Sequence, residues 1–329
     1  MDLKGIKMSK LESSSKIPKY ASMKTATINH WEKKIQQAIS LSHDDPFGER
    51  DLKTVANMLG ESMDNFSHKF VEFYGESYIH FTKRRRLEAG AGYLRHSDFG
   101  IGQISEMCGY THSSFTKAFR EVFNEAPISF RNRIYLPNEE HTLARTKIAT
   151  TPHNDPSSLI FTVDRTEDIR LPDYVLYYNI LPRNDDPIRS MVEYMSIYQQ
   201  QLYAIRTSLM LSGAMVITGT LDVVPVTNYA KMMMYVGIMV PILKVYDMAH
   251  LQIRLAFQDA FGLFTKHIPG GNYKKLPVPM NFAAAGLPMY EFINNSCRAG
   301  YFKMSGNHFF ISLTGAENSE IFIPWQRRY

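Results

Sequence analysis

Residues 58–90 read MLGESMDNFSHKFVEFYGESYIHFTKRRRLEAG, and residues 104–131 read ISEMCGYTHSSFTKAFREVFNEAPISFR. The two stretches are copies of one pattern at a constant offset of 49 residues, so that Gly60 matches Gly109. In each copy a glycine four residues after a small side chain permits a tight turn, and two phenylalanines at i and i+4 fix the next helix to a core. The pattern predicts two helix-turn-helix units in tandem, an arrangement typical of DNA-binding proteins.

Capping residues set the bounds of the helices around these turns. Asp51 and Ser62 each precede a short segment with apolar residues at helical spacing, and their side chains can accept hydrogen bonds from the first helical amides. A longer helix is expected from about Ser77 to the break near Asp98, where it would bridge the two units. Residues 30–41 have the same helical periodicity and predict a helix ahead of the first unit.

The composition bounds the class of protein. A length of 329 residues with 44% hydrophobic side chains favours two folded domains. Two cysteines leave no disulfide framework and no cysteine-based zinc site, which favours a reducing compartment. The most apolar run, 232–243, is interrupted by Pro241 and is too short to span a bilayer. We therefore expect a soluble, cytoplasmic protein without a membrane segment.

Charge supports nucleic-acid binding only locally. Residues 1–29 carry a net charge of +4, whereas residues 30–135 hold 14 basic and 14 acidic side chains. Basic side chains that could neutralise phosphates from one face are Lys69, Lys83, Arg84, Arg85, Arg86, Lys117, Arg120, Arg131 and Arg133. A charge run on a helix is equally often a solvated face, and Lys83, Arg84, Arg85, Arg131 and Arg133 could form salt bridges of the bridging helix instead of contacting phosphates.

The pattern changes after a proline-bearing stretch at 136–157, which we interpret as a linker. Residues 1–29 form a flexible basic tail in this interpretation, 30–135 the helical DNA-binding domain and 158–329 a second domain. In the second domain we expect strands at 159–163, 174–180, 215–221, 232–240, near 251, 308–313 and 320–324, with helices at 186–211 and 288–295. The predicted fold class is α plus α+β, with a duplicated β-α-β-β domain at the C-terminus.

From 51 to 133 the chain resembles the AraC/XylS family of transcription regulators. The resemblance includes Gly75 after the second helix, Arg86–Glu88 at the start of the bridging part of the long helix, and Pro127 and Arg131 in the closing motif. It covers about a quarter of the chain.

The resemblance implies a sequence-specific regulator of transcription, in this case an activator. Its two recognition helices would enter successive major grooves of duplex DNA, and its further partner would be RNA polymerase. Asn124 stands where the family has glycine, a replacement that asparagine permits because it tolerates a positive φ.

Residues 158–329 resemble the GyrI-like effector-binding domains. The similar segments are ITGTLDVVPVTNYAKMMMYVGIMV (217–240), HIPGGNYKKL (267–276) and EIFIPW (320–325). The resemblance implies a pocket between the two halves that binds small amphipathic, often cationic, molecules beside a buried acid. At the matching late strand, 309–312 reads FFIS without a carboxylate, so we expect a neutral or weakly polar ligand.

The outward faces of the two recognition helices carry side chains that can pair with bases or phosphates. With two phosphate-contacting arginines and a lysine included, the candidate DNA-binding residues are Asp64, Asn65, Ser67, His68, Lys69, Arg84, Ser113, Ser114, Thr116, Lys117 and Arg120. The alternative is an ordinary solvated surface.

Aromatic side chains in the second domain can line a pocket with an apolar face and a polar handle. The candidate ligand-binding residues are Tyr177, Tyr178, Tyr194, Tyr235 and Trp325. Met232, Met233 and Met234 would suit an adaptable pocket wall. For both sets, packing in the core is the alternative.

The sequence contains none of the nucleophile, phosphate-loop or zinc-helix motifs of common enzymes. We therefore expect a regulator that is not an enzyme and needs no cofactor or metal, with duplex DNA, a small amphipathic effector and RNA polymerase as its partners. The alternative is a DNA-binding protein whose second domain is a small hydrolase or a protein-interaction module.

Overall fold

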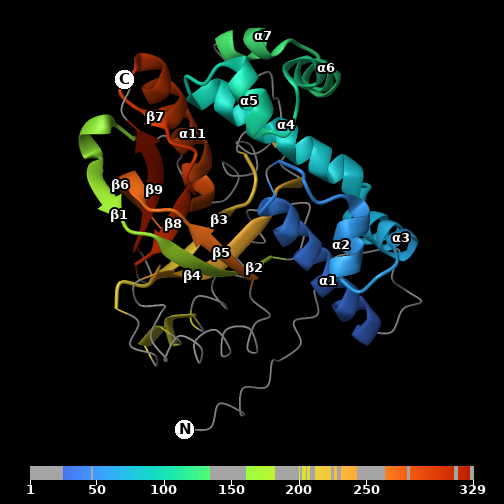
Figure 1. Ribbon diagram of the computed structural model, residues 1–329. Helices are drawn as coiled ribbons and strands as arrows, with labels where there is room; N and C mark the ends of the chain where they lie inside the picture. Colours follow the sequence, from blue (N-terminus) through green and yellow to red (C-terminus); the bar gives the residue numbers. More distant parts are fainter. Residues whose placement is uncertain are drawn as a thin grey trace.

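The computed structural model describes residues 25–45, 47–133, 161–181, 200, 202–204, 206–207, 212–223, 226–227, 231–242, 264–279, 282–314 and 318–326. Seven helices of the N-terminal half form a helical part that lies along one side of an antiparallel sheet built by the C-terminal half (Figure 1). The expected α plus α+β class is confirmed.

The helical part repeats itself at the predicted offset. Its helices are α1 (Thr25–His43), α2 (Leu52–Met58), α3 (Met63–Tyr74), α4 (Tyr78–His96), α5 (Ile101–Met107), α6 (His112–Phe123) and α7 (Pro127–Asn132). The pair α2 and α3 recurs as α5 and α6, shifted by 49 residues at every boundary. Helix α1 begins at Thr25, five residues before the helix start expected at His30, so the helix reaches into the segment interpreted as a tail.

The predicted caps are in place. Side chains of Asp51, Ser62 and Ser77 accept hydrogen bonds from backbone amides of the first helical turns of α2, α3 and α4. At the other end of the recognition helices, Gly75 caps α3 with a φ of 84° and Asn124 caps α6 with a φ of 56°. Asparagine therefore takes the left-handed conformation that glycine takes in the first unit, as its tolerance of positive φ predicts.

The C-terminal half forms one antiparallel sheet. Its described strands are β1 (Glu167–Leu171), β2 (Tyr174–Ile180), β3 (Met215–Thr220), β4 (Met234–Pro241), β5 (Phe264–Ile268), β6 (Gly271–Pro279), β7 (Lys303–Met304), β8 (Phe310–Leu313) and β9 (Asn318–Gln326), with helix α11 (Phe282–Ala299). Their order is β1-β6-β9-β8-β3-β4-β2-β5, and β7 pairs with β9.

The order of the strands reveals the duplication. In one half the chain runs β2, a segment with helical residues at 202–204, β3 and β4; in the other it runs β6, α11, β8 and β9. The orders β6-β9-β8 and β2-β4-β3 are equivalent, and the two halves meet where β3 pairs with β8. Only two residue pairs join β3 to β8, so the halves are held together by a short ladder. The predicted duplication is confirmed in the order of the strands, and most of the helix expected in the first half lies outside the described residues.

The two halves exchange their outer strands. Strand β1 runs directly into β2 but pairs with β6, whereas β5 runs directly into β6 but pairs with β2. Each connection has two residues, 172–173 and 269–270, which is too short to span a flat sheet. The sheet must therefore curl until its two outer edges meet at these connections, where the Gly270 amide donates to Asp173 Oδ1 at 2.8 Å.

Several expectations for the sheet need correction. Residues 161–165 form no strand, because Val163–Arg165 is a turn of 3₁₀-helix; a strand follows at β1, which period-two alternation did not reveal. Met232 and Met233 precede β4, and α11 is longer than the expected helix at 288–295. Most of the expected helix at 186–211 and the strand near 251 lie outside the described residues.

A single hydrophobic core joins the first helix-turn-helix unit to the sheet. Trp31 and Phe70 belong to the same buried cluster as Tyr178 and Tyr235. The second unit has its own cluster, which Val226 of the sheet part enters. Burial of apolar surface across this boundary stabilises one arrangement of the two parts.

The crossing of the two connections gives a test of the curled sheet. A Cβ added to Gly270 would lie 2.7 Å from Leu171 O and 2.8 Å from the Pro172 carbonyl carbon, both backbone atoms. We expect Gly270→Ala to lower the free energy of unfolding by about 1–3 kcal/mol, measured by urea denaturation of the full chain. Gly102→Ala is the control, because a Cβ there meets nothing within 4 Å. Equal stability of the two variants would contradict the crossing.

Candidate functional site

The two recognition helices, α3 and α6, present equivalent faces. Phe66 and Phe70 of α3 are fully buried, as are Phe115 and Phe119 of α6, so the opposite side of each helix points outward. Both helices stand at the edge of the helical part, away from the strands (Figure 1). This placement leaves their outward faces open to a large partner.

The structure places the predicted recognition-helix residues on these faces. The exposed ones are Asp64, Asn65, His68, Ser113, Ser114, Lys117 and Arg120, and the half-buried ones are Ser67, Lys69 and Thr116. The two sets lie on different helices, one in each helix-turn-helix unit.

Their side chains differ in availability. Asn65 Nδ2 donates to Glu61 Oε2 at 2.7 Å, and Lys69 pairs with Glu72 at 2.8 Å. The hydroxyls of Ser114 and Thr116 bond within the first turn of α6. Within the described part of the chain, no hydrogen bond or ion pair involves the side chain of Lys117 or of Arg120. Helix α6 therefore offers the two most available cationic groups of the recognition helices.

Arg84 does not share this exposed position. Its guanidinium lies 2.6 Å from Glu76 and 3.1 Å from Glu88, and only 14% of its side chain is exposed. Burial raises the pKa of Glu88, although the charge of Arg84 opposes that shift. The structure therefore favours the alternative for Arg84, a salt bridge of the bridging helix, over the expected phosphate contact.

Four other basic side chains, those of Lys83, Arg85, Arg131 and Arg133, are also engaged within the protein. Lys83 pairs with Glu121 at 3.1 Å, and Arg133 pairs with Glu125 at 2.7 Å. Arg85 donates to Leu221 O at 2.6 Å, and Arg131 donates to Phe99 O at 2.6 Å. These contacts tie helices together, so charge neutralisation of DNA depends on α3 and α6.

A cavity of about 470 Å³, here named the sheet cavity, lies where the two halves of the sheet meet the helical part. Methionine and branched aliphatic side chains form a large part of its wall, among them Met232, Met234, Ile268, Met289, Ile293, Met304, Ile311 and Ile321. His43 at the end of α1 and His96 at the end of α4 also line it, so the helical part contributes to the wall. The expected methionine wall holds for Met232 and Met234, whereas Met233 packs in the core.

Burial shifts the pKa of several polar groups of the sheet cavity. Burial lowers the pKa of His308 to about 3 and that of His96 to about 4, and neighbouring cations add to both shifts. Burial also lowers the pKa of Lys266 to about 8, against the charge of Asp44. Asp222, whose side chain is fully buried, has a raised pKa because of that burial. A wall of this kind suits an apolar molecule with one polar end.

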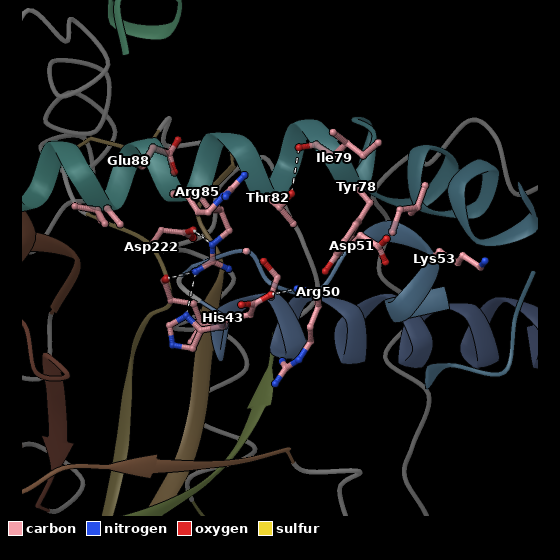
Figure 2. A pocket seen from close by; sticks show the side chains of 18 of the residues that line it. His43, Arg50, Asp51, Lys53, Tyr78, Ile79, Thr82, Arg85, Glu88 and Asp222 are labelled. Atoms are coloured by element: carbon pink, nitrogen blue, oxygen red, sulfur yellow. Dashed lines mark hydrogen bonds and ion pairs between the residues drawn. The ribbon is translucent and has the colours of Figure 1, made fainter. Parts of the chain in front are cut away.

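A second cavity, of about 610 Å³ and here named the helix cavity, lies between α4, the turn from α1 to α2, and residues 221–223. Figure 2 shows Arg85 reaching from α4 toward His43 and Asp222. His43, Asp222 and Gly306 line both cavities, so the two cavities are neighbours.

Of the predicted aromatic ligand contacts, those that the structure describes are not on either wall. Tyr177, Tyr178 and Tyr235 are fully buried in the core, which was the alternative for them. Tyr235 contacts a residue of the cavity wall from the core side: its hydroxyl lies 2.6 Å from Nε2 of His308, which lines the sheet cavity. Trp325 is half-buried, with Lys274 Nζ 4.6 Å from its ring, and Tyr194 lies outside the described residues. Tyr178 and Tyr235 pack in the cluster that joins the sheet to the first helix-turn-helix unit, whereas Tyr177, the preceding residue of β2, faces the other side of the sheet.

Sequence reasoning missed the acid of the cavity. Asp222 lies two residues after the end of β3, and it is the only acidic residue between Glu193 and Asp247. The absence of other acidic residues near Asp222 in the sequence could have identified it as the acid of the cavity, whereas the resemblance indicated residues 309–312. His43 and His308 carried no signal, because histidines distant in sequence meet only through the fold.

The described residues contain neither a candidate membrane span nor a candidate metal site. No described helix combines the length and apolar character that crossing a membrane requires. No three histidine, cysteine or carboxylate side chains among the described residues gather as metal ligands.

The chain is similar to known regulators over the helical part. Residues 55–133 match a helix-turn-helix domain family. The probable transcription factor PqrA of Proteus vulgaris is 31% identical over 88 residues, which are 26% of this chain and 72% of PqrA. The structure of a transcriptional regulator with an AraC-type DNA-binding domain from Chromobacterium violaceum matches 32% of this chain over 96% of its own length, with 22% identity and a TM-score of 0.31.

A second solved structure matches a larger share of the chain. The C-terminal domain of EcmrR matches 50% of this chain over 98% of its own length, with 12% identity and a TM-score of 0.30.

Lys117 provides the test of the recognition surface. With DNA sites selected from random duplexes, we expect Lys117→Ala to weaken preference at particular base pairs by about 1–3 kcal/mol, measured by fluorescence anisotropy. Arg170→Ala is the control, because it removes the same charge from exposed strand β1. An equal loss on all sequences would make Lys117 a phosphate contact instead.

Arg84 provides the test of the bridging salt bridges. Arg84→Ala leaves Glu88 buried without its cation, so we expect the free energy of unfolding to fall by about 3–5 kcal/mol. Lys83→Ala removes an exposed pair from the same helix and should change stability by less than about 1 kcal/mol. Chemical denaturation measures both. If Arg84→Ala is as stable as Lys83→Ala but binds all DNA sequences more weakly, Arg84 is a phosphate contact after all.

Proposed function

Because the chain belongs to the AraC family of helix-turn-helix transcription regulators, we propose that it activates transcription in response to a small amphipathic molecule held in the sheet cavity. Residues 30–135 are the DNA-binding domain in this proposal, and residues 158–329 are the effector-binding domain. The family gives DNA binding and regulation of transcription; the effector, the activation and the contact with RNA polymerase are ours.

The proposed mode of DNA binding uses both recognition helices. Helices α3 and α6 are equivalent by sequence offset and by capping, and both faces are exposed. Helices of this kind read the major groove, and two successive grooves on one face of DNA are about 34 Å apart. One copy of the chain would then read an asymmetric site of about two helical turns.

One observation carries the proposal of effector control. The wall of the sheet cavity includes His43 and His96, the last residues of α1 and α4, together with strands of the effector-binding domain. A molecule in this cavity therefore contacts both domains. A ligand shifts a conformational equilibrium only through such differential contacts, so its binding can alter the position of the helix-turn-helix units.

The ligand is bound rather than transformed in this proposal. Burial lowers the pKa of His96 and His308, two polar groups of the cavity, far below 7, and about half of the wall is made of methionine and branched aliphatic side chains. The related proteins are transcription factors, which supports a regulator over a hydrolase.

The effector proposal predicts a ligand response that depends on the sheet cavity. Among neutral amphipathic compounds, those that raise the melting temperature of the full chain should change its affinity for a selected DNA site and stimulate transcription by purified RNA polymerase. Met304→Trp should abolish the response, because it fills the cavity, whereas Tyr301→Trp should not, because residue 301 is 68% exposed and outside it.

Mass spectrometry of the recovered compound separates the alternatives. An unchanged compound agrees with a sensor, and consumption of the compound would favour the hydrolase. Stabilising compounds that leave DNA affinity and transcription unchanged would contradict effector control.

A further inference from the structure

Three polar side chains meet where the sheet cavity joins the helix cavity. His43 ends α1, Arg85 lies in the middle of α4, and Asp222 follows β3. Figure 2 shows the three side chains converging from these separate elements. We name them the junction cluster. His43 and Asp222 line both cavities, and Arg85 lines the helix cavity.

The hydrogen bonds of Arg85 fix the protonation pattern of the cluster. Arg85 Nη2 donates to Leu221 O at 2.6 Å and lies 3.1 Å from His43 Nδ1. A guanidinium can only donate, so His43 Nδ1 must accept. A neutral His43 then carries its proton on Nε2, and burial together with the charges of Lys266 and Arg85 lowers the pKa of His43 well below its usual value.

Each member of the cluster has one buried polar atom without a hydrogen-bond partner among the described residues. These atoms are His43 Nε2, Arg85 Nη1 and Asp222 Oδ1. The Nε of Arg85 lies 3.9 Å from Asp222 Oδ1, which is too long for a hydrogen bond. Two donors and one acceptor thus remain unsatisfied at one place, and leaving buried polar groups unpaired is unfavourable.

The charges of the cluster are balanced before any ligand binds. The cation of Arg85 is set against the anion of Asp222, and Lys266 lies 3.7 Å from Asp44. An anionic ligand would be repelled by Asp222, and a cationic ligand by Arg85 and Lys266. A neutral group that both accepts and donates avoids both penalties.

We propose that the junction cluster binds the polar head of the effector, and that this head is a neutral group with an acceptor and a donor, such as a primary carboxamide. Its oxygen accepts from Arg85 Nη1, its N–H donates to Asp222 Oδ1, and His43 holds Arg85 in place through the bond from Arg85 Nη2 to His43 Nδ1. The apolar body lies against the methionines of the sheet cavity. The inference rests on the proposed function and names the ligand class for the same site.

Such a head would contact the two parts of the protein at once. Its bond to Arg85 acts on α4 and, through the bond between Arg85 and His43, on the end of α1, and its bond to Asp222 acts on the segment that follows β3. Binding is therefore coupled to the junction of the two domains through these side chains.

The test uses three probes with one apolar body: biphenyl-4-carboxamide, its N,N-dimethyl amide and biphenyl-4-carboxylate. We expect the full chain to bind the primary amide at least tenfold more tightly than either of the others, measured by titration calorimetry. Asp222→Asn keeps an oxygen for the Met233 amide, which Asp222 Oδ2 now accepts at 2.5 Å, but replaces the free acceptor with a donor. This variant should lose the tenfold preference. Asp168→Asn, an exposed carboxylate on β1, is the control and should retain it.

The outcomes separate this inference from the proposed function. Equal binding of the three probes, tightest binding of the carboxylate, retention of the preference in Asp222→Asn or failure of all three to bind would overturn the role of the cluster. If neutral amphipathic compounds still change DNA affinity without dependence on Asp222, effector control stands and this inference fails. If the amide binds through Asp222 but DNA affinity is unchanged, the head subsite stands and effector control fails.

Discussion

The arrangement of the whole chain depends on a network of two carboxylates around Arg84. Glu76 accepts from Arg84 and pairs with Lys231 at 3.2 Å, while Glu88 pairs with Arg84 and accepts from Thr227 at 2.8 Å. Each carboxylate thus has one partner on α4 and one partner in the sheet part. Because Arg84, Glu76 and Glu88 are largely buried, removal of Arg84 takes the shared cation from both carboxylates, so the network favours a single position of α4 against the sheet. Helix α4 in turn joins the two helix-turn-helix units, and the network therefore sets where both recognition helices stand.

This use of basic residues has a consequence for DNA binding. Lys83, Arg84, Arg85, Arg131 and Arg133 form a basic group in the sequence, but each bonds to another part of the protein. Few cations remain to neutralise phosphates, and the helical part has equal numbers of acidic and basic side chains. Non-specific affinity, which depends on counterion release, should then be small. Discrimination between sequences must come from the exposed faces of α3 and α6.

Local signals in the sequence determined the helical part, whereas contacts distant in sequence determined the cavities. The offset of 49 residues, the caps at Asp51 and Ser62 and the left-handed Asn124 follow from neighbouring residues, and all are confirmed. The exchange of β1 and β5 between halves could not be predicted, because alternation within a strand says nothing about its partner. The same limit applies to the tyrosines: alternation identified Tyr177 and Tyr178 as strand residues but did not tell a packed face from a cavity wall. Asp222 became part of the candidate site only because the fold brings the end of β3 to α1 and α4.

The boundary between the domains combines two requirements that usually conflict. Apolar packing across it, from Trp31 and Phe70 to Tyr178, favours one fixed arrangement. A buried polar cluster at the same boundary, with unpaired atoms on His43, Arg85 and Asp222, makes that arrangement less stable than it would be with every group satisfied. The apolar contacts keep the domains together, and the unsatisfied atoms leave free energy to be gained from a ligand of matching polarity. A boundary built only from apolar side chains would hold the helices equally well but would offer such a ligand no selective contact. The position of the polar cluster at the ends of α1 and β3, rather than deep in the sheet, places that gain where it can act on the recognition helices.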